Sequence, residues 1–267
     1  MELLSKDHAT YRTEGVGSSV LASLWPSIRF YLPFLYIVVH SSNLARNGKY
    51  DDRAWQQSSL NVLRQLESSG VQVEVEGLEH LKNSDEPVVF IGNHLSMLET
   101  VVLPSLILPY KKATFVVKQN LLDYPVFKHV MRSRNPISVT RTNPRQDLKQ
   151  VLEQGQQRLA DGISVIIFPQ TTRTEFNPEQ FSSIGVKLAK KAGAKIIPLA
   201  LLTDAWGNGR LFKDLGRIEP KNKVKFRFGA PIEVKGKGTE EHQQIIEFIQ
   251  QNLKRWQDER KVIANNQ

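Results

Sequence analysis

The chain has 267 residues and a formal charge of +9, from 36 Lys plus Arg against 27 Asp plus Glu. It contains no cysteine, which excludes a disulfide framework, thiolate metal sites and thiol catalysis. Apolar residues make up 40% and one long apolar stretch is present, so wholesale disorder and a polytopic membrane protein are excluded. The positive charge favours an anionic partner, such as nucleic acid, acidic lipid or a phosphorylated substrate.

The beginning of the chain combines a polar segment with an apolar one. Residues 1–19 lack the basic start and the small-residue cleavage site of a secretory signal. Residues 20–39 carry 15 apolar side chains in 20, but Pro26, Arg29 and Pro33 interrupt the run too often for a transmembrane helix. The pattern predicts a helix that lies in the membrane interface, and a helix buried in the protein core is the alternative.

A second helix is predicted from Asp51 to Ser69, with Asp51 or Asp52 as its cap. Its leucines and valines give part of an apolar stripe. Residues 1–70 are therefore expected to form a polar segment and a two-helix membrane-associating motif, in front of a separate unit at residues 71–267.

From residue 71 onward, short apolar runs alternate with helical patterns. This alternation predicts an α/β fold with a largely parallel, mixed sheet covered by helices. In the last predicted strand, basic and apolar residues alternate, which predicts a half-buried strand with a basic outer face. The expected strands lie at residues 71–75, 87–91, 113–117, 136–140, 163–168, 195–202 and 221–228, and the expected helices end near Leu108, cover 143–159 and 182–192, and begin at Thr239.

The strongest chemical signal is His94 followed by Glu99, just after the second of these strands. Ligands of α/β proteins favour the carboxyl ends of parallel strands. If His94 lies in the turn and Glu99 in the first helical turn, the carboxylate orients one ring nitrogen and leaves the other as a base. Two alternatives remain: Ser96 acting as a nucleophile, or His94 serving only as a helix cap.

Cations follow three further strands, namely Lys118, Arg141 and Arg173. Arginine offers a planar donor fork that suits phosphate, and the hydroxyls beside Arg173 suit it too. Solvated surface charge is the alternative for each cation taken singly. The sequence has no phosphate-binding glycine loop and no cluster of metal ligands, so we expect neither a nucleotide site nor metal catalysis.

Four motifs in order make the chain resemble the PlsC-like glycerolipid acyltransferases, the lysophosphatidic acid acyltransferases, over about residues 70–230. The family pattern N-H-x4-D is met by Asn93-His94 with Glu99 in the acid position. A second motif ends in an arginine after a strand, matched by Arg141. The pattern F-P-E-G-T-R is met by residues 168–173, and a strand with a central proline is matched by residues 196–200.

The resemblance implies an O-acyltransferase with an N-terminal two-helix motif. In that reading His94 takes the proton from the hydroxyl of lysophosphatidic acid, Glu99 orients His94, and the hydroxyl attacks an acyl thioester on coenzyme A or acyl carrier protein. Phosphatidic acid for phospholipid biosynthesis would result, with no cofactor and no acyl-enzyme. The implied substrate-binding residues are Asn93, Lys118, Arg141, Gln170, Thr171, Thr172 and Arg173.

The implied location is the cytoplasmic face of a membrane. There the basic residues Lys187, Lys190, Lys191 and 221–227 would meet anionic headgroups, or would simply be solvated. Gln170-Thr171 departs from the family's Glu-Gly, which leaves another lysophospholipid acceptor open. A non-catalytic membrane-binding scaffold of the same fold is a further alternative. No nucleic-acid-binding motif is present, so no nucleic-acid partner is expected.

Overall fold

The computed structural model describes residues 9–14, 25–82, 85–170, 172–209 and 213–265. Within these ranges eight strands form one sheet in the order β1-β2-β8-β7-β3-β6-β4-β5. The strands are β1 (Thr10–Arg12), β2 (Val73–Glu76), β3 (Val89–Gly92), β4 (Ala113–Lys118), β5 (Ile137–Val139), β6 (Ser164–Ile167), β7 (Ile196–Leu202) and β8 (Val224–Phe228).

The sheet is mixed but mostly parallel. The five strands β7, β3, β6, β4 and β5 are parallel neighbours. Strand β8 pairs antiparallel with β7, β2 runs parallel to β8, and β1 pairs antiparallel with β2. The predicted α/β class with a largely parallel, mixed sheet is confirmed.

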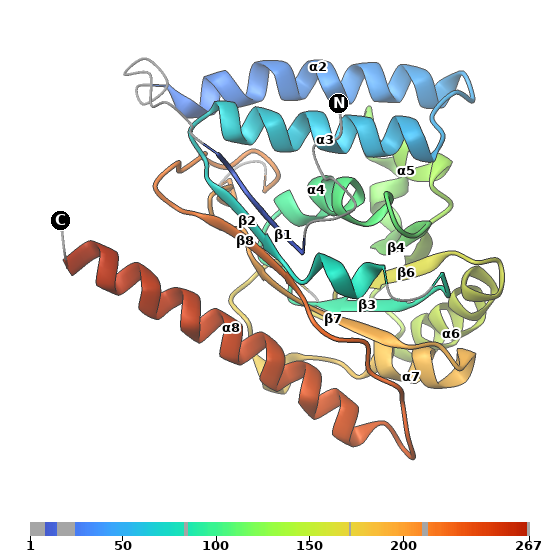
Figure 1. Cartoon of the computed structure of the whole chain (residues 1–267). Helices are drawn as coiled ribbons and strands as arrows, with labels where there is room; N and C mark the ends of the chain where they lie inside the picture. The colour runs from blue at the N-terminus through green and yellow to red at the C-terminus, as the bar shows by residue number, and fades with distance from the viewer. Residues whose placement is uncertain (1–8, 15–24, 83–84, 171, 210–212, 266–267) are drawn as a thin grey trace.

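Helices cover both faces of this sheet (Figure 1). One layer contains α2 (Pro26–Arg46), α3 (Asp52–Ser68), α4 (Leu98–Ile107) and α5 (Phe127–Ser133), and the other contains α6 (Pro144–Ala160), α7 (Ile184–Ala192) and α8 (Thr239–Asn265). In the described part of the chain, the 3-10 turns η1 (Leu78–Leu81), η2 (Gln119–Asp123) and η3 (Pro178–Gln180) lie in the connections.

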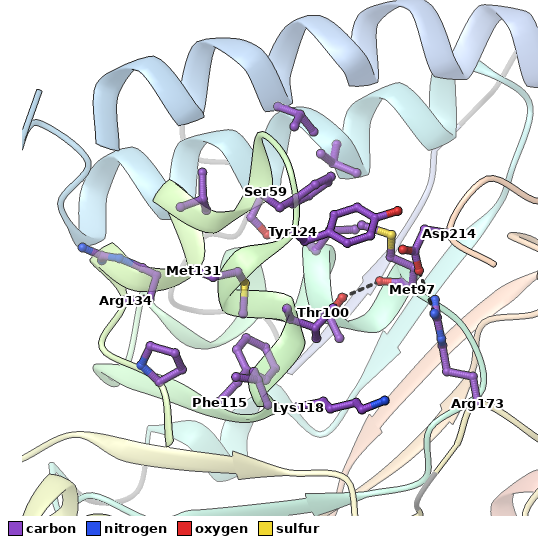
Figure 2. Close-up of a pocket in the computed structure, with 18 of the residues that line it drawn as sticks. Ser59, Met97, Thr100, Phe115, Lys118, Tyr124, Met131, Arg134, Arg173 and Asp214 are labelled. Carbon is purple, nitrogen blue, oxygen red and sulfur yellow. Dashed lines mark hydrogen bonds and ion pairs between the residues drawn. The ribbon is translucent and has the colours of Figure 1, made fainter. Parts of the chain in front are cut away.

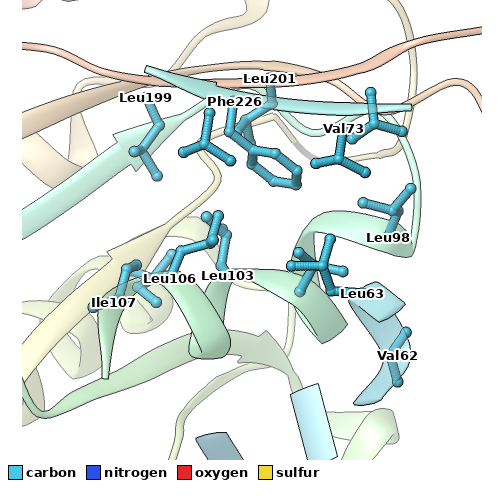
Figure 3. Packing of buried hydrophobic residues seen from close by; sticks show 14 of the residues in the cluster. Val62, Leu63, Val73, Leu98, Leu103, Leu106, Ile107, Leu199, Leu201 and Phe226 are labelled. Atoms are coloured by element: carbon cyan, nitrogen blue, oxygen red, sulfur yellow. The ribbon is translucent and has the colours of Figure 1, made fainter. Parts of the chain in front are cut away.

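Alternation along the strands sends side chains into two apolar cores. Phe90 and Ile166 belong to the core under α2, α3 and α4, whereas Val89, Ile91 and Val165 belong to the core under α6, α7 and α8. Figure 3 shows the first core, in which α4 packs against the sheet through Leu98, Leu103, Leu106 and Ile107, opposite Val73, Leu199, Leu201 and Phe226.

The predicted helix boundaries follow from local capping. The Asp51 carboxylate accepts the N–H of Ala54 at 2.8 Å and starts α3. Asn143 accepts the N–H of Gln146 at 3.2 Å, with Pro144 as the first residue of α6. Gly193 ends α7 in the left-handed conformation, with φ of +66°.

Helix α2 has two apolar sides. Phe30 and Phe34 are buried and meet the ring of Trp206 edge-on, at centroid distances of 4.8 and 5.0 Å. On the opposite side Leu32 and Tyr36 are 67% and 70% exposed. Among the described residues no helix is long and apolar enough to cross a membrane, and residues 20–24 of the predicted apolar segment lie outside them.

The segment before residue 70 packs closely on the α/β unit. The buried residues of α2 and α3 belong to the same hydrophobic cluster as those of α4 and the sheet. Strand β1, which the sequence did not indicate, pairs with β2. The two-helix segment and the α/β unit therefore share one core.

The expected basic face of the last strand is wrong. Lys225 is buried and lies 3.1 Å from Glu74, and it also pairs with Glu259 of α8. Arg227 lies 3.1 Å from Glu76. The strand pairing sets Glu74 beside Lys225 and Glu76 beside Arg227, so acidic residues of β2 neutralise the cations of β8.

The lysines of α7 remain exposed, but they lie on the other side of the molecule from α2. Helix α7 packs in the second core, across the sheet from α2 (Figure 1). Lys187, Lys190 and Lys191 therefore do not border the exposed apolar side of α2.

Candidate active site

The candidate site begins at the turn that follows β3. Gly92 has no room for a side chain, because a Cβ there would lie 2.9 Å from the Cβ of Leu199. The buried Asn93 side chain donates to the carbonyl of Leu201 at 2.8 Å and accepts the N–H of Leu201 at 2.9 Å. These two bonds extend the pairing between β3 and β7, and they fix the turn that carries His94.

His94 and Glu99 meet as the sequence predicts. His94 Nδ1 lies 2.9 Å from Glu99 Oε1. His94 is 15% exposed at the side chain, and Glu99 is fully buried in the first turn of α4. An ionised Glu99 requires the proton to be on Nδ1, so in the neutral ring Nε2 is the basic nitrogen. Within the described residues Nε2 has no hydrogen-bond partner, and His94 lines a cavity.

Glu99 is held ionised by the groups around it. Burial alone would raise the pKa of its carboxyl, but the bond to His94, the charge of His94, and bonds from Thr203 and Ser96 together lower that pKa. Thr203 Oγ1 donates to Glu99 Oε2 at 2.7 Å, and the N–H groups of Leu95 and Ser96 donate to Glu99 Oε1 at 2.6 and 3.0 Å. The carboxylate is therefore fixed before any substrate binds.

Ser96 supports this arrangement and is not placed as a nucleophile. It is buried, and its hydroxyl donates to the carbonyl of Thr203 at 2.9 Å or to Glu99 Oε2 at 3.1 Å. Ser96 does not line the cavity. The geometry disfavours the Ser96 alternative.

The loop after β6 packs directly on His94. The ring of Phe168 stacks on the imidazole with centroids 4.7 Å apart and planes 5° apart. Gln170 Oε1 accepts the N–H of His94 at 3.0 Å, while Gln170 Nε2 donates to the carbonyl of Thr174 at 3.3 Å. A carboxylate in place of this amide could accept the first bond but could not donate the second.

A cavity of about 680 Å³ opens beside His94. Most of its wall is apolar, and α2, α3, α4, β4 and the segment from η2 to α5 contribute to it. Figure 2 shows Phe115 and Met131 inside it, Arg134 at one end, and Arg173 with Asp214 at the other. The apolar lining includes Phe34, Val38, Trp55, Val101, Phe115, Leu121, Phe127 and Met131.

The structure brings most of the predicted polar residues to this cavity. Lys118, Arg141, Thr172 and Arg173 line it together with His94. Asn93 and Gln170 do not, because their buried side chains bond to the protein's own backbone. Thr171 lies outside the described residues.

Arg141 is held in an unusual backbone conformation, with φ of +63°. The carboxylate of Asp147, in the first turn of α6, accepts the N–H groups of Arg141 at 2.7 Å and of Thr140 at 2.8 Å. Burial lowers the pKa of the Arg141 guanidinium, the charge of Asp147 opposes this, and the charge of Arg173 adds to the decrease. Arg141 and Arg173 therefore lie close enough to influence each other.

Arg173 is engaged by a carboxylate. Its Nη2 lies 2.7 Å from Asp214 Oδ1, and both residues line the cavity. Across the described residues, no group of three or more His, Asp or Glu side chains is arranged to hold a metal ion. The polar end of the cavity thus combines one base with several cations.

The chain is similar to proteins of known family. A family model described as acyltransferase matches residues 72–202, which include His94, Glu99, Arg141 and Arg173. A 1-acyl-sn-glycerol-3-phosphate acyltransferase of Pseudomonas aeruginosa is 30% identical over 184 residues, which are 68% of this chain and 66% of the relative. The chain belongs to the PlsC-like acyltransferase family. The aligned regions cover 66% or less of the curated relatives' lengths.

Two further similarities concern the fold and a shorter part of the sequence. A crystal structure of the 1-acyl-sn-glycerophosphate acyltransferase from Thermotoga maritima superposes with a TM-score of 0.66 at 19% identity, over 89% of this chain and 97% of that one, which shows the shared fold. A lyso-ornithine lipid O-acyltransferase of Rhizobium meliloti is 32% identical over 91 residues, 34% of this chain and 30% of the relative.

The sequence did not indicate several residues of this candidate site. Thr203 follows a buried strand, so the rule that selected Arg141 could have found it. Asp147 is an acid in the first turn of a helix that the sequence did predict. Asp214 carries no local signal, because only the tertiary fold sets it beside Arg173, and it lies outside the region that the family model matches.

Proposed function

We propose that the chain is an O-acyltransferase that moves a fatty acyl group from an acyl thioester to the free hydroxyl of lysophosphatidic acid, giving phosphatidic acid. The observation that carries this proposal is the His94–Glu99 pair at 2.9 Å, on a cavity that also holds Arg141 and Arg173. A base and cations in one cavity suit an acceptor with a hydroxyl and a phosphate.

The proposed chemistry needs no covalent enzyme intermediate. The acceptor hydroxyl gives its proton to His94 Nε2 while its oxygen attacks the thioester carbonyl. Glu99 stabilises the imidazolium that forms. The tetrahedral intermediate then collapses with cleavage of the C–S bond, and the sulfur leaves as a thiol after taking the proton from His94. Atoms and charge balance without a cofactor.

The cationic end of the cavity suits the phosphate of the acceptor, and the apolar wall suits a fatty acyl chain. Arg173 and Arg141 bind the acceptor phosphate, with Lys118 as a further cationic contact and Thr172 as a hydroxyl donor. The apolar wall accommodates an acyl chain, which keeps the chain out of water. Coenzyme A and acyl carrier protein both supply a thioester, so either can serve as the donor.

A second candidate function keeps the chemistry and changes the acceptor to another lysolipid. Gln170 departs from the family's Glu, and the Rhizobium relative is named for a lyso-ornithine acceptor. A non-catalytic scaffold of the same fold is a weaker candidate, because such a protein has no need of an intact His94–Glu99 pair.

Membrane association at the cytoplasmic face is part of the proposal. The exposed side of α2 presents Ile28, Leu32, Leu35, Tyr36 and Val39, with Trp25 at its N-cap, an apolar stripe with aromatic rings that suits the bilayer interface. Co-flotation with liposomes at high salt checks this directly. A smaller fraction of a Leu32→Ser/Tyr36→Ser variant than of the wild-type protein should float with the liposomes. Equal flotation would count against α2 as the contact.

The decisive experiment incubates the purified protein in detergent with lysophosphatidic acid and labelled acyl-coenzyme A, and then with acyl carrier protein thioesters. Labelled phosphatidic acid from the wild-type protein, absent with His94→Ala, supports the proposed reaction. No product with either donor, but product from lyso-ornithine lipid or another lysolipid, favours the second candidate. Inactivity with every acceptor favours the scaffold.

A further inference from the structure

The cation assigned to the acceptor phosphate already binds an anion of the protein. Arg173 Nη2 lies 2.7 Å from Asp214 Oδ1, and Figure 2 shows the two side chains meeting at the end of the cavity. We propose that Asp214 is a specificity-determining residue, which competes with the acceptor's phosphate for Arg173. The inference rests on the proposed function.

A ligand can displace Asp214 from its ion pair with Arg173. The side chains of Arg173 and Asp214 are 21% and 23% exposed, so an incoming ligand can reach them. Carboxylate and phosphate oxygens bind a guanidinium in the same way. Asp214 therefore occupies Arg173 as a phosphate oxygen would.

A second Asp–Arg pair, whose aspartate lies in the same connection between β7 and β8, offers a comparison. Asp204 binds Arg260 through two bonds, at 2.6 and 2.7 Å, and Arg260 also donates to the carbonyl of Lys223. Neither Asp204 nor Arg260 lines the main cavity. Among the described residues Asp214 has one ion-pair contact, to Arg173, and it lines the cavity, whereas Asp204 and Arg260 link the connection after β7 to α8.

Asp214 is carried on a segment that α2 holds in place. The backbone N–H of Ile218 donates to Ser27 Oγ at 3.0 Å, and the hydroxyl of Tyr31 donates to the carbonyl of Gly216. Trp206, earlier in the same segment, is buried against α2. The bonds at Gly216 and Ile218, shortly after Asp214 in the chain, anchor this stretch to α2.

The competition sets a requirement on the acceptor. A phosphate that reaches Arg173 and its neighbour Arg141 forms several charge-assisted bonds and replaces the carboxylate. An acceptor without a phosphate leaves the Arg173–Asp214 pair intact and gains nothing from Arg173. Asp214 thus weakens the binding of every acceptor that must displace it from Arg173, by the strength of one partly exposed ion pair, and so lowers the preference for phosphorylated over uncharged acceptors.

The test compares Asp214→Asn with Asp204→Asn, a matched loss of one carboxylate from the same connection between β7 and β8. Asp214→Asn should lower the KM for lysophosphatidic acid by about two- to fivefold, the equivalent of a partly exposed ion pair. The KM for the acyl donor and the rate with monoacylglycerol should not change. Asp204→Asn should leave the acceptor KM unchanged, and Asp214→Glu should restore the wild-type value.

A double-mutant cycle shows whether the effect passes through Arg173. In an Arg173→Gln background, Asp214→Asn should no longer lower the acceptor KM. An unchanged or raised KM in the single variant, or the same gain without Arg173, overturns the proposal. A raised KM would make Asp214 a positioning residue for Arg173 instead.

Equilibrium binding keeps this test separate from the proposed function. Calorimetry with lysophosphatidic acid and with inorganic phosphate should show tighter binding to Asp214→Asn, dependent on Arg173. If the wild-type protein does not turn over lysophosphatidic acid, the proposed function fails, and tighter phosphate binding would still support the competition. Unchanged phosphate binding overturns it whatever the activity.

Discussion

The two ends of the polar site are built in opposite ways. At the His94 end, Glu99 is fully buried and accepts bonds from Leu95, Ser96 and Thr203, so the pair has one arrangement. At the cation end, Arg141 stands on a strained backbone and Arg173 is held by an ion pair that solvent can reach. The comparison teaches that the proposed proton-transfer group is fixed before any substrate binds, whereas the proposed anion-binding groups include one, Arg173, whose present partner a ligand can reach.

The largest expected effect tests the fixed end. His94→Ala should lower kcat by about 10²- to 10⁴-fold, because it removes the proposed general base, and the variant should still fold. Steady-state turnover with a thermal melt of the same preparation checks both statements. A variant that folds and keeps more than a tenth of the wild-type kcat would contradict the assigned role.

The next prediction tests whether His94 needs the negative charge of Glu99. Glu99→Gln should lower kcat by about a hundredfold, because the imidazolium loses its counter-charge. The folded pKa of Glu99 lies below its ordinary value of 4.5, so the ionised form contributes stability that is complete above that pH and is lost as the pH falls through the lowered pKa.

Thermal melts between pH 7 and pH 3 measure this contribution. The wild-type protein should melt well above Glu99→Gln at neutral pH, and the gap between their Tm values should narrow as the pH falls below 4.5. A gap that stays constant over that range would show that the Glu99 charge does not stabilise the fold.

At the exchanging end, Arg173→Gln should raise the KM for lysophosphatidic acid by about 10- to 100-fold, the range of a charge-assisted bond. Its kcat should change by only a few fold, since Arg173 does not touch the reacting hydroxyl in the proposed arrangement. Arg260→Gln is the matched control, because its guanidinium also pairs with an aspartate but lies outside the cavity. An equal rise of the KM for lysophosphatidic acid in the two variants would contradict the proposal that Arg173 binds the phosphate.

The smallest effect concerns the strained arginine. Asp147→Asn keeps the size of the side chain but weakens the bonds to the N–H groups of Thr140 and Arg141. We expect the acceptor KM to rise by about two- to fivefold and the Tm to fall by about 2–4 °C, for a loss near 1 kcal/mol. Initial rates measured at varied acceptor and at varied donor concentration give the two KM values. We expect only the acceptor KM to change, whereas a purely structural role of Asp147 would leave both the acceptor KM and the donor KM unchanged.

The sequence predicted those parts of the fold and site that depend on near neighbours. The caps at Asp51 and Asn143 involve residues three positions away, and the His94–Glu99 pair spans a single turn. Strand ends were found from short apolar runs, and the carboxyl ends of parallel strands meet at one edge of a sheet. That is why Lys118, Arg141 and Arg173 could be expected together.

Features that depend on distant segments were not predictable in the same way. Alternation in β8 shows that one side is polar, but not that Glu74, Glu76 and Glu259 lie against it. Gln170 looked like a ligand because of its motif, whereas its amide is used to join His94 to the loop. Asp214 reaches Arg173 from 41 residues further along the chain.

The exposed apolar stripe of α2 also sets the conditions under which kcat and KM can be measured. Five large apolar side chains on one helix form a patch that water alone does not stabilise. In dilute buffer without amphiphile, two copies of the chain can cover these patches with each other, and the fraction that does so rises with protein concentration. Detergent or lipid covers the patch and prevents this self-association. Initial rates should therefore be proportional to the enzyme concentration only when an amphiphile is present.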